Sequence, residues 1–171
     1  MIALQRLCVH YCLKFLRLIL DVLSLLFGLL TPSQVKKLPH NSDPILFESC
    51  IELSNRIKKG EISCEEVIKA YWKRVQQVQP FINAVVDSCF SEAIAEARRV
   101  DTIVKQELSG ASVTESVLSK PLLGVPFTCK NSIAVKNLAF DAGSLLLKGN
   151  RAVNDAPVID NLRKSGAIPI A

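Results

Sequence analysis

The sequence predicts an α/β fold preceded by a membrane helix, and three observations support this. Residues 1–30 form one apolar block. Between residues 45 and 108, apolar residues recur at helical spacing. Near the C-terminus a helical pattern is followed by Gly166 and then an apolar strand, a common unit of layered α/β folds. The expected organisation is a hydrophobic anchor at 1–30, a linker at 31–44 and a folded domain at 45–171.

The leader has the length and composition of a membrane anchor. Leu13 to Leu30 reaches the lower limit of about 17 residues for a helix that crosses a bilayer. Lys14 and Arg17 fall near its entry end, where long side chains can reach the interface, and Asp21 can pair with Arg17. A cleaved signal peptide and an interfacial amphipathic helix are the alternatives. We expect a single uncleaved anchor in an endomembrane that contacts lipid through residues 13–30.

Charge and cysteine usage exclude several classes of protein. The formal net charge is +5, and most of it lies in residues 1–40, whereas a nucleic-acid-binding protein carries its basic residues on the folded body. We therefore expect no nucleic-acid partner. The chain has six cysteines and two histidines but no C-x-x-C pair, so neither a metal site nor a disulfide scaffold is expected, and no cofactor.

The first part of the body reads as helices. A helical pattern over residues 47–59 ends at Gly60, a typical residue after a helix C-terminus. The S-x-x-E sequence at 63–66 predicts a capping box, and the helix that it opens is expected to end near Val78 because Pro80 follows. Residues 81–86 are expected to form a short strand or an extended piece, and residues 88–108 a long amphipathic helix.

The second part contains the strands. Pro121 to Lys130, PLLGVPFTCK, is typical of an irregular strand, and residues 131–150 of a loop. Asn154 or Asp155 is expected to cap a helix that reaches residue 165. Residues 167–171 then begin a strand.

Lys130 is the residue in this pattern that could perform chemistry. Side chains alternate along a strand, so Thr128 and Lys130 should share one face and Cys129 the other. A lysine in apolar surroundings has a lowered pKa and can act as a general base. The competing interpretation is a solvated lysine at the end of a strand, which is the commoner case for this residue type.

The sequence resembles the amidase signature family. Residues 121–131, PLLGVPFTCKN, are similar to its lysine-bearing strand, P-x-x-G-[VI]-P-[FL]-x-[VL]-K-[DE]. Residues 45–87 resemble its N-terminal helices, and residues 154–170 its helix–strand unit. The resemblance implies the N-terminal portion of a mixed β-sheet flanked by helices. With the hydrophobic leader, the chain is most similar to the membrane-anchored fatty-acid amide hydrolases of the second type.

The resemblance also implies a mechanism and a substrate. Lys130 would be the base of a Ser–cis-Ser–Lys triad that hydrolyses a carboxamide C–N bond, here in a lipid amide, and the enzyme could be a homodimer. Both serines of the family lie in a Gly/Ser-rich stretch that this sequence does not contain. Ser132 and Ser144 are expected to be ordinary loop residues, and the 171-residue chain alone is expected to be an inactive fragment.

The sequence departs from the family pattern in two segments, and two other functions are alternatives to the lipid amidase. Cys129 replaces the usual Val or Leu, and Asn131 the usual acid, while Asp141 and Ala142 stand where the family often has Thr-Ser. The alternatives are another amidase of the family or an amidotransferase subunit, and a non-catalytic, membrane-tethered interaction module.

Overall fold

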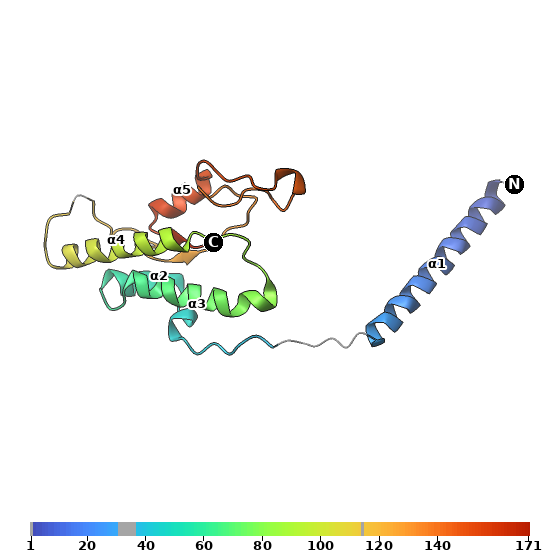
Figure 1. Ribbon diagram of the computed structural model, residues 1–171, viewed down its shortest axis with the longest axis horizontal. Helices are drawn as coiled ribbons and strands as arrows, with labels where there is room; N and C mark the ends of the chain where they lie inside the picture. The colour runs from blue at the N-terminus through green and yellow to red at the C-terminus, as the bar shows by residue number, and fades with distance from the viewer. Residues whose placement is uncertain (1, 31–36, 114) are drawn as a thin grey trace. The chain divides into compact units, whose positions relative to one another are not determined.

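The computed structural model describes residues 2–30, 37–113 and 115–171, which belong to two compact units, Met1–Lys37 and Leu38–Ala171 (Figure 1). Helix α1 (Ile2–Leu30) accounts for the described part of the first unit. The helix expected in the leader is therefore present. The expected linker at 31–44 falls partly outside the described residues, and a short 3₁₀ helix, η1 (Pro44–Phe47), begins within it.

The expected membrane-spanning anchor is not supported. Among the described residues, no helix has both the length and the apolar character needed to cross a bilayer. The reason lies in the sequence of α1, because Lys14, Arg17 and Asp21 all fall within the apolar stretch from Leu13 to Leu30. A charged residue at the centre of a spanning helix costs about 2.5–3.5 kcal/mol on insertion scales.

Helix α2 (Cys50–Lys58) begins later than its apolar pattern indicated, because Ser49 caps it. The Ser49 side chain accepts a hydrogen bond from the Glu52 backbone N–H, and the Glu52 carboxylate accepts one from the Ser49 N–H at 2.8 Å. This reciprocal capping box satisfies two N–H groups at the helix start. At the other end, Gly60 has a φ of +69°, as expected for the residue that follows a helix.

Helix α3 (Cys64–Ile82) is capped differently from the prediction. The Ser63 hydroxyl accepts a hydrogen bond from the Glu66 N–H at 3.1 Å, but the reciprocal bond of a capping box is not formed. Instead, the Asp101 carboxylate accepts hydrogen bonds from the backbone N–H groups of Cys64, at 2.6 Å, and Glu65, at 3.1 Å. Asp101 belongs to helix α4 (Phe90–Leu108), so a tertiary contact completes the cap.

The predicted end of α3 is wrong, and of residues 81–86, expected to form a strand or an extended piece, the first two belong to the helix and the rest form no strand. The helix includes Pro80 and continues to Ile82, since a proline in the last turn removes one hydrogen bond and leaves the preceding turns intact. Asn83 then ends the helix in the left-handed conformation, with a φ of 45°. The Gln79 amide holds the following backbone, accepting from the Val85 N–H and donating to the Val85 carbonyl. These bonds take the place of strand pairing.

The sheet in the described residues is a parallel pair. Strand β1 (Pro126–Phe127) pairs with β2 (Ile168–Pro169) in the register Pro126↔Ile168 and Phe127↔Pro169. Helix α5 (Pro157–Lys164) directly precedes β2. A 3₁₀ turn, η2 (Leu145–Leu147), lies in the loop between β1 and α5. The expected α/β class is thus confirmed, with a smaller sheet than a mixed sheet flanked by helices would have.

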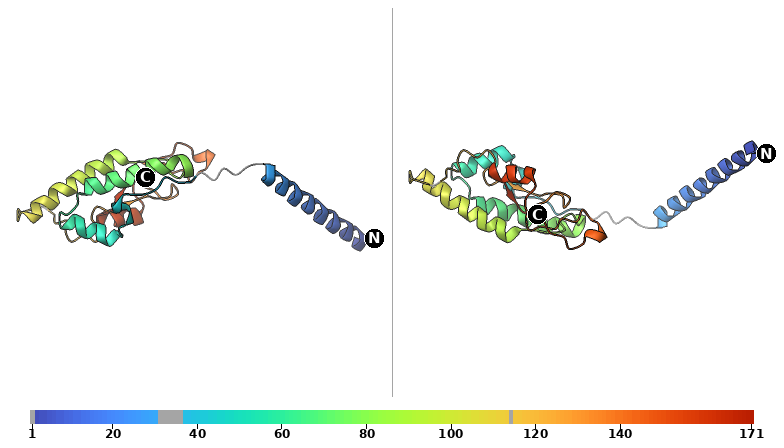
Figure 2. Two further views of the ribbon diagram at one scale, coloured as in Figure 1. Left: turned by 90° about the horizontal axis from the view of Figure 1, so that it is seen from below. Right: turned by 90° about the horizontal axis from the view of Figure 1, so that it is seen from above.

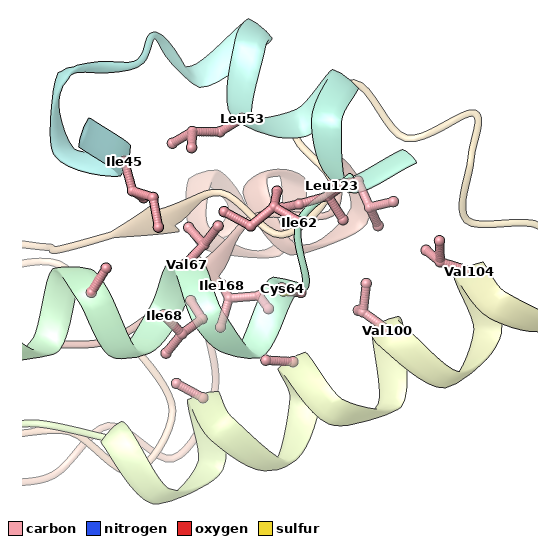
Figure 3. Packing of buried hydrophobic residues seen from close by; sticks show 14 of the residues in the cluster. Ile45, Leu53, Ile62, Cys64, Val67, Ile68, Val100, Val104, Leu123 and Ile168 are labelled. Atoms are coloured by element: carbon pink, nitrogen blue, oxygen red, sulfur yellow. The ribbon is translucent and has the colours of Figure 1, made fainter. Parts of the chain in front are cut away.

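The core of the second unit lies between the helices and this strand pair. Helices α3 and α4 run antiparallel side by side (Figure 1). Figure 3 shows Cys64, Val67 and Ile68 of α3, Val100 and Val104 of α4 and Ile168 of β2 in one buried cluster. The residues predicted to line the inner face of α4 are buried or half-buried, as expected from their spacing.

Candidate functional site

Lys130 lies three residues after β1, on the exposed side of the segment that continues the strand. Phe127 and Cys129 pack against a small apolar cluster of Val135, Leu138 and Ile159. Thr128 and Lys130 are exposed, so the predicted alternation of side chains is confirmed. The Cys129 N–H donates to the Ala171 carbonyl at 2.9 Å, which extends the parallel pairing to the residue before the lysine.

Lys130 borders a pocket of about 50 Å³, where the end of β1 meets residues 85–87 and the end of the β2 segment. Its ammonium group forms no hydrogen bond or ion pair with the described residues, and its side chain is exposed. The pocket lining includes the apolar residues Val85, Val86 and Ile133, but Lys130 itself is exposed, so the apolar surroundings expected for a lysine base are not complete among the described residues. The pocket can hold water molecules, but a typical ligand site has about 300–1,000 Å³.

A hydrogen bond fixes the backbone directly after Lys130. The Asn131 side-chain amide donates to Asp141 Oδ1 at 2.7 Å, and the same oxygen accepts from the Gly143 N–H at 2.9 Å. The Ser144 N–H also donates to the Asp141 carbonyl, at 2.8 Å. The turn that follows Asp141 is thereby tied to the lysine-bearing segment.

Asp87 bonds the other end of the loop that contains Asp141 to the rest of the second unit. One carboxylate oxygen, Oδ2, accepts hydrogen bonds from the Ala139 N–H and from the Arg151 guanidinium, each at 2.8 Å. Arg151 Nε also donates to the Asn137 carbonyl at 2.8 Å, and Ala139 and Arg151 form an isolated antiparallel bridge. Residues 137–151 are therefore closed into a loop that is anchored at both ends next to Lys130.

Neither serine near the lysine is joined to it. Ser132 is exposed, and Ser144 stands before η2 without a side-chain capping bond. No hydrogen bond of either hydroxyl to Lys130 is present in the described parts of the chain. The prediction that Ser132 and Ser144 are loop residues is consistent with this arrangement.

Two larger grooves lie between α4 and the α5–β2 unit, with volumes of about 340 and 470 Å³. Glu92, Glu96 and Arg163 line both. A hydrogen bond from Arg99 lowers the pKa of Glu96, which favours its ionised form. Arg163 lies 2.7 Å from the Asp155 carboxylate. Within the described ranges, no group of three or more His, Cys, Asp and Glu side chains is arranged to hold a metal ion.

The roles of Asp87, Asp141 and Arg151 are not predicted by the sequence patterns. Asp87 followed a segment that was assigned as a strand, so its contacts with a loop more than 50 residues away had no local signal. The Asn131–Asp141 bond did have a signal. The two departures from the family pattern, an amide in place of the acid at 131 and an acid at 141, are complementary.

Comparison with known proteins places these features in a family. Residues 66–171 match the family described as Amidase. Fatty-acid amide hydrolase 2-A of Danio rerio is 37% identical over 160 residues, which cover 92% of this chain and 30% of that protein. A glutamyl-tRNA(Gln) amidotransferase subunit of Clostridium acetobutylicum is 32% identical over 121 residues, covering 70% of this chain and 23% of that one.

The fold agrees with the sequence matches. A solved structure of a fatty acid amide hydrolase superposes with a TM-score of 0.64 at 25% identity, and covers 75% of this chain and 22% of that chain. The present chain thus spans less than a third of the length of these curated relatives. From the matched residues, the order of its motifs and the shared fold, the chain belongs to the amidase signature family.

Proposed function

We propose that this chain forms the lysine-bearing part of an amidase that hydrolyses fatty-acid amides, with Lys130 as the general base. The observation that carries the substrate class is the extent of the sequence matches. A match over 160 residues is longer than the second unit, Leu38–Ala171, so the likeness to the Danio rerio hydrolase includes residues of the first unit. The amidotransferase match of 121 residues is short enough to lie within the second unit alone.

In this proposal, Lys130 receives a proton. The neutral lysine accepts it, through a bridging serine, from the serine nucleophile as that serine attacks the amide carbonyl. Backbone N–H groups stabilise the oxyanion, and the proton passes to the leaving amine as the C–N bond breaks. Water then attacks the acyl-enzyme, releasing the fatty acid and regenerating the serine. Neither serine is assigned to a residue of this chain.

The chain's own contribution is to position the lysine. The β1–β2 pairing fixes the backbone as far as Cys129, and the Asn131–Asp141 bond fixes the residue after the lysine. Further protein placed over the exposed face of Lys130 would exclude water from it. Exclusion of water disfavours a charged ammonium group and so favours the neutral form that a base requires.

Helix α1 is proposed to associate with membrane lipid through residues 13–30. Its described apolar side chains are widely exposed, among them Leu13, Phe15 and Phe27, and a lipid surface would remove them from water. In alkaline carbonate extraction, a fusion of residues 1–40 to a soluble reporter should stay in the membrane pellet. Recovery of the fusion in the supernatant would contradict this association.

The substrate class is tested by hydrolysis assays on the protein expressed from its native coding sequence. A long-chain primary fatty-acid amide should be hydrolysed much faster than a short-chain amide, because the acyl chain adds apolar contact in the transition state. Equal rates for both amides would contradict the lipid assignment. Amide transfer to glutamyl-tRNA without hydrolysis of the long-chain amide would favour the amidotransferase alternative, which the match over 121 residues supports.

A separate assay addresses the 171-residue chain alone. Because no nucleophilic serine is assigned within it, the purified chain should not be labelled by a fluorophosphonate probe. Labelling at Ser132 or Ser144 would place a nucleophile in the loop and overturn the assignment of both as loop residues.

A further inference from the structure

The turn η2 exposes three consecutive leucines. Leu145 is 87% exposed, Leu146 96% and Leu147 44%. The turn lies at one end of the second unit, opposite the loop that follows α4, in the view of Figure 1 and in both views of Figure 2. Single exposed leucines are common on protein surfaces, but three in sequence on one protruding turn form an apolar tip that needs an explanation.

The leucine tip lies in the most basic part of the folded body. Residues 128–153 contain four basic residues and one acidic residue, Asp141, whose carboxylate is engaged by Asn131. Residues 1–40 have a net charge of +4, and the remaining residues outside both segments have 12 basic and 14 acidic side chains. All four basic side chains are exposed, and they are Lys130, Lys136, Lys148 and Arg151. Lys148 directly follows the tip in sequence, whereas Arg151 is paired with Asp87. An apolar tip in a segment with an excess of exposed basic groups is complementary to an anionic lipid surface, which offers acyl chains below negative headgroups.

Hydrogen bonds connect the same turn to the segment that carries Lys130. Asp141, whose carbonyl accepts from the Ser144 N–H just before η2, is bonded to the residue that follows the lysine. The other end of the loop is held by Arg151 on Asp87. The loop that carries the leucines is therefore bonded at its base to the lysine-bearing segment and to Asp87.

We propose that Leu145–Leu147 is a membrane-docking tip that inserts into an anionic lipid surface. This inference rests on the proposed function and deepens it, because it states where a lipid amide would enter, from the bilayer at the Lys130 side of the unit. A second copy of the chain fits the tip less well. A stable protein–protein interface buries about 800 Å² on each partner, far more than three side chains on a turn can supply.

The test uses a fluorescent probe in the full chain. In a Trp72→Phe background, which keeps the aromatic stack on Phe90, Leu146→Trp places a single tryptophan on the tip. Leu108→Trp is the matched control. Leu108 is 51% exposed at the C-terminal end of α4, and this variant has the same helix α1 as the tip variant. Each variant is mixed with vesicles of phosphatidylcholine and phosphatidylserine in which the phosphatidylcholine acyl chains are brominated.

The tip probe should shift its emission to the blue and be quenched by the bromines, while the Leu108→Trp control is not. Adding Lys148→Glu to the tip probe should lower vesicle affinity several-fold, as should vesicles without phosphatidylserine. Equal quenching of the tip probe and the control would mean that α1 alone brings the chain to the membrane, and would overturn the proposal. Absence of quenching at the tip would also overturn it.

Two further results distinguish lipid docking from the proposed function and from contact with a second copy of the chain. Quenching of the tip probe in a protein that hydrolyses no fatty-acid amide would support the docking tip while removing the proposed function. A change from dimer to monomer on Leu146→Ser, measured by light scattering without lipid, would assign the tip to a second copy of the chain and overturn lipid docking.

Discussion

The side-chain amide of Asn131, the residue after the lysine proposed as the catalytic base, donates a 2.7 Å hydrogen bond to the carboxylate of Asp141. The family pattern has an acid at the first of these positions. Here the acid stands at the second, and an amide donor replaces it at the first. The two departures from the family pattern thus bond to each other, and the bond holds the loop that carries the leucine tip.

Asp141→Ala should loosen this loop without unfolding the domain. The substitution removes the acceptor of the Asn131 and Gly143 N–H groups, at a cost of about 1 kcal/mol for a part-buried bond. Hydrogen exchange at Gly143 and Ser144 should become faster by roughly tenfold, whereas exchange in α4 stays unchanged. Asp141→Asn keeps an acceptor oxygen and serves as the control. Equal protection in the wild type and Asp141→Ala would show that the bond does not hold the loop.

Gly166 should be intolerant of a side chain because it packs against the backbone before β1. A Cβ at this position would lie 2.8 Å from the Leu123 Cα and 3.1 Å from its nitrogen, and the φ is +94°. Gly166→Ala should lower the free energy of unfolding by about 3 kcal/mol or more, from left-handed strain plus the clash. Urea denaturation measures this loss.

Gly149→Ala is the matched control for Gly166→Ala. Gly149 has a φ of +91°, but a Cβ at this position would have no neighbour within 4 Å, so only the strain of about 1 kcal/mol applies. Equal losses for the two variants would exclude the close packing of Gly166 as the cause.

Features specified by local sequence were predicted correctly. The spacing of Ala93, Ala97, Val100 and Val104 alone predicts α4 and its buried face, since the period of a helix is a local property. The helix–glycine–strand order around Gly166 likewise predicts α5 and β2. The alternation that exposes Lys130 and half-buries Cys129 follows from strand geometry.

Features specified by distant residues were not predicted. The cap of α3 is completed by Asp101, 37 positions after Cys64, so no local sequence pattern indicates that hydrogen bond. The end of α3 depends on whether Pro80 falls in the interior or the last turn of the helix, and the Gln79 side chain bonds the backbone that follows this turn. The surroundings of Lys130 depend on how several loops meet, so its exposure could not be read from an apolar strand sequence.

Asp101→Ala should destabilise the contact between α3 and α4. It removes both acceptors of the Cys64 and Glu65 N–H groups, so a loss of about 1–2 kcal/mol in the free energy of unfolding is expected. Asp101→Asn keeps one acceptor oxygen and should lose less. Chemical denaturation followed by circular dichroism measures both variants, and a wild-type midpoint for Asp101→Ala would refute the tertiary cap.

Glu65 should make stability depend on pH under acidic conditions. Hydrogen bonds from Arg98 and then Lys69 lower its pKa to about 2 from an ordinary value of 4.5. Because the folded-state pKa is the lower one, the stabilising contribution is full above the unfolded value of 4.5 and is lost as the pH falls toward 2. The pair is on the surface, so the effect is small and decreases with salt.

Comparison of Glu65→Gln with wild type isolates this contribution. The urea midpoint of the wild type should fall more between about pH 5 and pH 2 than that of Glu65→Gln. Glu66→Gln, which replaces a neighbouring exposed carboxylate without an ion pair in the described residues, should behave as the wild type. Parallel profiles for wild type and Glu65→Gln would contradict the assignment.

The central claim is that Lys130 is the base of an amidase. The most direct measurement is the rate of hydrolysis of a long-chain fatty-acid amide by Lys130→Ala in the protein expressed from its native coding sequence, with Lys136→Ala, a second exposed lysine nearby, as the control. The proposed role of Lys130 as base predicts that Lys130→Ala lowers kcat by about 10²-fold or more, while Lys136→Ala retains the wild-type rate. Wild-type kcat in Lys130→Ala would contradict it and return Lys130 to a solvated residue at the end of a strand.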